Sequence, residues 1–103
     1  MPYDLPPELQ SQFGDYLADE RSSDWHRVQK SLSLGAVVSG PVVFRPPHGV
    51  YLDVGLGFPA VLLATRFSPQ LVCPDGLPAL GTITTASVAR FSDSNRQIVL
   101  QQP

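Results

Sequence analysis

The amino-acid sequence predicts a mainly β protein in which an N-terminal helical segment precedes a five-stranded barrel. Eleven prolines and eight glycines among 103 residues favour short strands joined by turns over a helical bundle. The spacing of the apolar residues changes from helical to strand-like near Gly35. A chain of this length, 43% hydrophobic and with a net charge of −2, is expected to form one packed domain.

Residues 1–34 form the predicted helical segment. Its apolar residues recur at helical spacing in two groups: Leu9, Phe13, Tyr16 and Leu17, followed by Trp25, Val28 and Leu32. The polar residues 19–23 between the groups leave open whether the segment is one helix or two. We expect both groups to pack on the barrel, because an exposed aromatic stripe promotes aggregation. The alternative is a docking helix for a partner or for a second copy of the chain.

Residues 35–103 form the predicted barrel. Segments rich in valine, threonine or isoleucine are separated by turn-forming residues, and they span residues 36–44, 50–54, 60–67, 82–91 and 96–101. Pro46 and Pro47 end the first strand, because neither can donate a hydrogen bond to a neighbouring strand. Gly40 inside that strand predicts a bulge or a barrel corner. Residues 68–80 are expected to form a loop with room for one helical turn.

Charge is distributed unevenly between the two parts. Residues 1–34 carry six acids and three bases, whereas residues 35–103 carry three acids and four bases. Lys30 is the only lysine, and charged residues make up only 16% of the chain. An isoelectric point near 5.4 excludes a strongly basic nucleic-acid-binding protein, for which values above about 9 are typical. Any contact with nucleic acid is therefore expected to be weak and to be lost as salt is added.

Other classes of function find little support in the sequence. Cys73 is the only cysteine, so no internal disulfide, no Cys/His metal site and no cofactor is expected. His26 and His48 lie in different segments, and neither a Gly-x-Ser-x-Gly motif nor a phosphate-binding glycine loop is present. We therefore expect a protein that is not an enzyme. No apolar run reaches the length of a membrane span, and the N-terminus does not resemble a signal peptide, which predicts a cytoplasmic protein.

Residues 32–101 resemble a known family in the order of their motifs. Residues 34–40 are Leu-Gly-Ala-Val-Val-Ser-Gly, residues 47–54 are Pro-His-Gly-Val-Tyr-Leu-Asp-Val, and residues 93–100 are Asp-Ser-Asn-Arg-Gln-Ile-Val-Leu. Together these motifs resemble the S-one RNA-binding domain, the repeat named after ribosomal small-subunit protein S-one. The resemblance implies an OB-fold, which is a five-stranded Greek-key barrel.

The resemblance also implies a binding face on strands two and three, between the loop that joins strands one and two and the loop that joins strands four and five. His48 and Tyr51 take the positions of two aromatic residues that stack on bases. Asp93 and Arg96 match an acid and arginine pair near the last hairpin. Leu63 replaces the family's histidine on strand three, which removes one contact.

Two further arginines complete the expected surface. Arg45, in the first loop, and Arg66, at the end of the third strand, can reach phosphate. With the four residues named above, they predict non-catalytic binding of single-stranded or structured RNA, including RNA of the ribosome. The alternative is a protein-interaction module on a barrel that has lost RNA binding, which the scarcity of lysine favours. A buried Tyr51, or a helical segment lying over strands two and three, would argue against RNA at this face.

Overall fold

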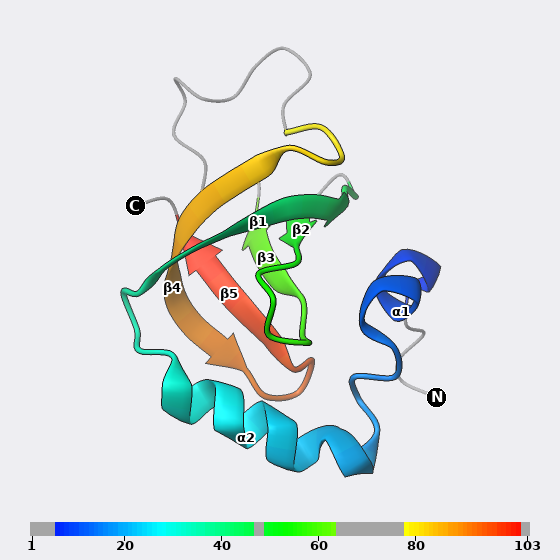
Figure 1. Ribbon diagram of the computed structural model, residues 1–103, viewed down its shortest axis with the longest axis vertical. Helices are drawn as coiled ribbons and strands as arrows, with labels where there is room; N and C mark the ends of the chain where they lie inside the picture. The colour runs from blue at the N-terminus through cyan, green and yellow to red at the C-terminus, as the bar shows by residue number, and fades with distance from the viewer. Residues whose placement is uncertain (1–5, 47–48, 64–77, 102–103) are drawn as a thin grey trace.

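The computed structural model describes residues 6–46, 49–63 and 78–101 (Figure 1). The elements are α1 (Pro7–Phe13), η1 (Asp19–Arg21), α2 (Ser22–Ser31), β1 (Val37–Phe44), β2 (Gly49–Leu52), β3 (Ala60–Leu63), β4 (Ile83–Ser92) and β5 (Gln97–Gln101). The prediction of a mainly β chain with N-terminal helices is confirmed. Four of the predicted strands agree with β1, β2, β4 and β5 to within two residues at each end. Residues 64–67 of the third predicted strand, and most of the loop that follows, lie outside the described residues.

The strands close into a barrel in the order β1-β2-β3-β5-β4. All neighbouring pairs are antiparallel except β3 and β5, which run parallel. This order is that of the OB-fold Greek key. Alternating residues of the strands fill the interior, and the side chains of Val50, Leu52, Leu62, Ile98 and Leu100 are fully buried there.

At Gly40 the backbone of β1 lies close to the backbone that follows β2. It pairs with Thr84 of β4 on one side, and a Cβ atom at this position would collide with the backbone carbonyl of Asp53 on the other. The register shift that the sequence predicts near Gly40 lies slightly later, between Val42 and Phe44. The glycine is therefore required by the approach of two backbones, and the bulge falls where the strand nears its end.

The N-terminal segment consists of two α-helices joined by a turn that contains η1. The backbone leaves α1 at Gly14, whose φ of 70° suits a glycine. Figure 1 shows α1 beside the barrel and α2 along the end of the barrel at which β4 turns into β5. Five side chains of the segment are buried in the same apolar cluster as the barrel interior, and they are Leu9, Phe13, Tyr16, Trp25 and Val28. We call residues 6–34 the N-terminal arm.

Candidate functional site

An OB-fold binds oligonucleotides on the face of its second and third strands and on the β1–β2 and β4–β5 loops beside that face. In this protein the β4–β5 loop, residues 93–96, is held by α2. The carboxylate oxygen Oδ1 of Asp93 accepts a hydrogen bond from Nε1 of Trp25 at 2.9 Å and another from Nε2 of Gln29 at 2.8 Å. Asp93, which the sequence assigns to an RNA surface, therefore binds the arm.

Trp25 is the main apolar contact of α2 with the barrel. Its ring packs edge-on against Phe58 at 5.1 Å and against Phe91 at 5.8 Å between ring centroids. Only 2% of Trp25 is exposed. Edge-to-face aromatic pairs at these distances are stabilising beyond the area they bury, so the indole closes this end of the barrel.

Arg96 binds a different part of the arm. Its NH1 nitrogen donates to the carbonyl oxygens of Tyr16, at 3.2 Å, and Ala18, at 2.7 Å. Its backbone adopts a φ of 50°, the only positive value among the described non-glycine residues. This conformation turns the tight β4–β5 loop and costs free energy for a residue with a Cβ atom. Arg96 therefore holds the turn that leads to η1.

Arg96→Ala is expected to lower the free energy of unfolding by about 1.5–3 kcal/mol, because the charged donor to two carbonyl groups is lost. Arg96→Gly loses the same bonds but removes the strain of the positive φ, so we expect it to be more stable than Arg96→Ala by about 1 kcal/mol. Urea unfolding of the three proteins measures both differences. Arg90→Ala, at an exposed position of β4, is the matched control and should change stability by less than about 0.5 kcal/mol. Equal losses for Arg90→Ala and Arg96→Ala would contradict this role.

The β2–β3 loop is also covered by the arm. The NH2 nitrogen of Arg21 donates to the carbonyl of Gly57 at 3.1 Å, and its guanidinium lies 4.7 Å from the centroid of the Phe58 ring. The side chain of Gln12 donates to Oδ2 of Asp53 at 2.6 Å. Contacts from α1, η1 and α2 thus reach the ends of β2, β3 and β4.

Tyr51 lies on β2 but is only 8% exposed. Burial raises the pKa of both Tyr51 and Tyr16, and a hydrogen bond from the Gln97 side chain to each phenol acts in the opposite direction. On its other side Tyr51 packs against Phe44, at 5.4 Å between ring centroids and an interplanar angle of 34°. Tyr51 is thus buried between the arm and the end of β1, which argues against direct stacking of a base on its ring.

The predicted site residues therefore lie in different parts of the structure. Asp93 and Arg96 lie together in the β4–β5 loop and are both bonded to the arm. Arg45 lies just after β1 and is exposed. His48 and Arg66 lie outside the described residues. Arg45 belongs to the β1–β2 loop, whereas Asp93 and Arg96 belong to the β4–β5 loop, where the arm is bound.

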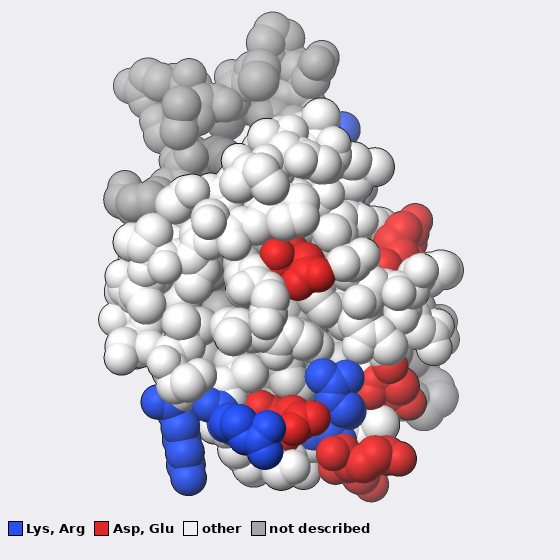
Figure 2. Space-filling model, viewed as in Figure 1, with Lys and Arg blue, Asp and Glu red and all other residues white. Residues whose placement is uncertain are grey.

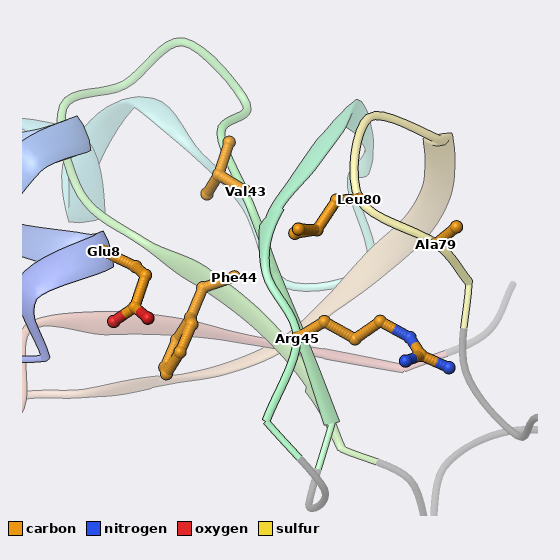
Figure 3. A pocket seen from close by; sticks show the side chains of 6 residues that line it. All are labelled: Glu8, Val43, Phe44, Arg45, Ala79 and Leu80. Atoms are coloured by element: carbon orange, nitrogen blue, oxygen red, sulfur yellow. The ribbon is translucent and has the colours of Figure 1, made fainter.

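Sequence reasoning missed one aromatic residue, Phe44, at the β1–β2 end of the face. A pocket of about 500 Å³ lies there, lined by Glu8, Val43, Phe44, Arg45, Ala79 and Leu80 (Figure 3). The Phe44 ring turns toward Glu8 of α1, whereas the Arg45 guanidinium extends away from it toward Ala79. The sequence held one signal for Phe44. It is the last residue of a predicted strand and stands directly before an arginine and two prolines.

Charged residues are sparse over the barrel. Figure 2 shows them gathered along the edge formed by η1 and α2, with a largely uncharged barrel surface above. Within the described ranges, no group of three or more His, Cys, Asp or Glu side chains could hold a metal ion. In the same part of the chain, no helix is long and apolar enough to cross a membrane.

Barrel order, strand register and the position of the loops define an OB-fold protein. No sequence-family profile matches the chain, and no curated protein does. Solved structures do match. GSP13 from Bacillus subtilis has 14% identity and a TM-score of 0.57, over 68% of this chain and 55% of GSP13. A putative exosome complex RNA-binding protein has 23% identity and a TM-score of 0.55, over 68% of this chain and 42% of that one.

RNase R from Mycoplasma genitalium is similar over 82% of this chain but only 15% of its own, with 13% identity and a TM-score of 0.60. This chain thus corresponds to about half of GSP13 and to a small part of RNase R. Identities this low establish the fold alone. The fold that the S-one resemblance implies is confirmed.

Proposed function

We propose that this protein binds single-stranded RNA without catalysis, at the β1–β2 end of the OB face, with Phe44 stacking on a base and Arg45 contacting phosphate. The observation that carries the proposal is the pocket at this end, which is lined by the half-buried ring of Phe44 and by the exposed Arg45. The fold supports it, because OB-folds bind oligonucleotides with this loop. Two similar solved structures support RNA as the ligand as well, since one is that of a putative exosome complex RNA-binding protein and the other that of an RNase.

Phe44 has the surroundings of a stacking platform. It is half-buried and rests on Tyr51, which restricts the movement of its ring. Stacking of one base on an aromatic side chain stabilises binding by about 1–3 kcal/mol. In this proposal Tyr51 supports the Phe44 ring from beneath and does not contact the base itself.

The opposite directions of the Phe44 and Arg45 side chains (Figure 3) determine how a strand would lie. A single strand that crosses the end of β1 can stack one base on Phe44 and place the phosphate of a neighbouring nucleotide beside Arg45. We keep His48 as a second proposed stacking residue and Arg66 as a second proposed phosphate contact. The carboxylate of Glu8 lines the Phe44 side of the pocket, so phosphate is expected on the Arg45 side.

Few charges take part, and this makes the expected affinity low and salt-sensitive. Electrostatic binding to phosphate scales with the number of cationic contacts. The guanidinium of Arg96 is hydrogen-bonded to carbonyl groups of the arm, and the chain has only one lysine. Stacking on Phe44 therefore has to supply much of the specific binding free energy.

Phe44→Ala is expected to weaken binding of a labelled oligouridylate by about 1–3 kcal/mol, at least fivefold in Kd, because one stacked base is lost. Phe44→Tyr keeps the ring and should bind like the wild-type protein. Fluorescence anisotropy at low salt measures Kd, and circular dichroism checks that each variant is folded.

Arg45→Ala and Arg90→Ala form a matched pair for the phosphate contact. Both residues are exposed arginines of the barrel, but Arg90 lies near the other end of β4, away from the pocket. Only Arg45→Ala should weaken binding and reduce its salt dependence. Unchanged Kd values for Phe44→Ala and Arg45→Ala would overturn the proposed site.

A protein-interaction module is the second candidate. The specific observation in its favour is that the arm already binds both Asp93 and Arg96, so part of the usual oligonucleotide face is occupied. A protein partner that copurifies after nuclease treatment and high salt, combined with no binding of any oligonucleotide, would favour this candidate over RNA binding.

A further inference from the structure

We infer that α2 is an internal competitor for RNA, which occupies the β4–β5 half of the OB face and must leave before a longer RNA can use that half. This inference rests on the proposed function, because it concerns the regulation of the same site. The face is then divided in two: the β1–β2 half, at Phe44, stays accessible, and the β4–β5 half, at Asp93, is closed by the helix.

The contacts of α2 with the β4–β5 half have the chemistry of a nucleobase contact. The Trp25 indole packs edge-on against Phe58 and Phe91, and its N–H donates to Asp93. The Gln29 amide donates to the same carboxylate oxygen. A base presents the same combination, an aromatic ring with N–H donors at its edge. The helix and a base therefore compete for one acceptor and one aromatic surface.

The attachment of α2 differs from that of the rest of the arm. Only two residues of this helix are buried, Trp25 and Val28. Helix α1 also buries two residues, Leu9 and Phe13, but the turn after it adds the buried Tyr16, and Arg96 holds that turn through two carbonyl groups.

The boundary between the firmly held part of the arm and α2 lies at Arg21. This residue binds the carbonyls of Phe13 and Gly57 and forms an ion pair with Asp24 at 3.2 Å. Residues 32–36, which join α2 to β1, form no helix or strand. Gly35 and Ala36 are hydrogen-bonded to Val88 of β4, so in the proposed release α2 moves between Arg21 and Leu34 while α1 stays in place.

The single tryptophan of the chain makes this release measurable. In a titration of the full chain with RNA, anisotropy of a 5′-labelled oligonucleotide reports binding, and Trp25 emission and its quenching by acrylamide report exposure of the indole. A dinucleotide reaches only the Phe44 half, whereas an oligouridylate of about 8 nucleotides spans an OB-fold face. We expect the dinucleotide to bind without changing Trp25. The longer RNA should shift Trp25 emission to longer wavelength and increase quenching.

Gln29→Ala weakens the attachment of α2 without changing the barrel. Loss of one hydrogen bond to Asp93 should tighten binding of the longer oligonucleotide by roughly fivefold and leave dinucleotide binding unchanged. Gln10→Ala, the same substitution at an exposed position of α1, is the matched control and should leave both affinities as they are.

The outcomes separate the two claims. If the longer RNA binds while Trp25 stays as protected as in the free protein, or if Gln29→Ala binds it no better than Gln10→Ala does, the competition is overturned and RNA binding at Phe44 stands. If no oligonucleotide changes the anisotropy with the wild-type protein or with Gln29→Ala, the proposed function is overturned, and the inference with it.

Discussion

Gly40→Ala is expected to be among the most damaging single substitutions in the barrel, with a loss of about 3 kcal/mol or more in the free energy of unfolding. The added Cβ atom would collide with the carbonyl oxygen of Asp53, and would lie 2.7 Å from its carbonyl carbon and 3.2 Å from the Cα atom of Val54. All three are backbone atoms, so no side chain can rotate away. Overpacking of this kind commonly costs about 1–3 kcal/mol, and more where the surroundings are rigid.

The position of Gly40 makes relaxation difficult, since β1 pairs with β4 here and with β2 immediately afterwards. Urea unfolding followed by circular dichroism measures the loss, which is a large part of the roughly 5–15 kcal/mol that stabilises a domain. Gly55→Ala is the control for backbone strain: its φ is 86° and a Cβ atom there meets nothing within 4 Å. It should cost only about 1–2 kcal/mol. A loss at Gly40 no larger than the loss at Gly55 would contradict the steric explanation.

Trp25→Ala is expected to lower the free energy of unfolding by about 3–5 kcal/mol, the usual cost of removing a buried large aromatic side chain. The substitution leaves a cavity beside Phe58 and Phe91 and removes one of the two donors to Asp93. The urea midpoint, with the slope of the transition checked for two-state behaviour, measures the effect.

Two controls show what the Trp25 measurement reports. Trp25→Phe keeps an aromatic ring and loses only the donor and part of the area, so its loss should be smaller. His26→Ala, at the next residue of α2 on its exposed side, should change stability by less than about 0.5 kcal/mol. If Trp25→Ala were as stable as His26→Ala, α2 would not be packed on the barrel in solution.

Much of the fold could be predicted because strands and turns have local signals. Alternation of apolar residues and turn-forming residues locates strands, and β4 and β5 lie where the pattern predicts them. The parallel pairing of β3 with β5 is a contact between segments far apart in the chain. Local spacing carries no information about this pairing, and the resemblance to the S-one family implied only the OB-fold as a whole. The number of helices was left open because the polar residues 19–23 interrupt the apolar spacing; in the structure, residues 14–21 form the turn with η1 between α1 and α2.

The candidate site was harder to predict than the fold. The sequence identified Asp93 and Arg96 as polar residues of a binding loop, but their partners are far away in the chain. Trp25 is 68 residues from Asp93, and Ala18 is 78 residues from Arg96. Phe44 was overlooked because a strand residue of this type is most often part of the core, and its half-exposure depends on where β1 ends.

By itself the sequence located β1, β2, β4 and β5 to within two residues at each end, and it placed most of the acidic residues in the N-terminal segment. These properties depend on residue type and on spacings of two to four residues, which any local stretch of chain carries with it. Only the tertiary structure decided which part of the OB face stays accessible. Packing of the arm buries Tyr51 and binds Asp93 and Arg96, while Phe44 and Arg45 remain at the pocket. Occupation of a surface is a contact between distant segments, so it becomes definite only when the whole chain has folded.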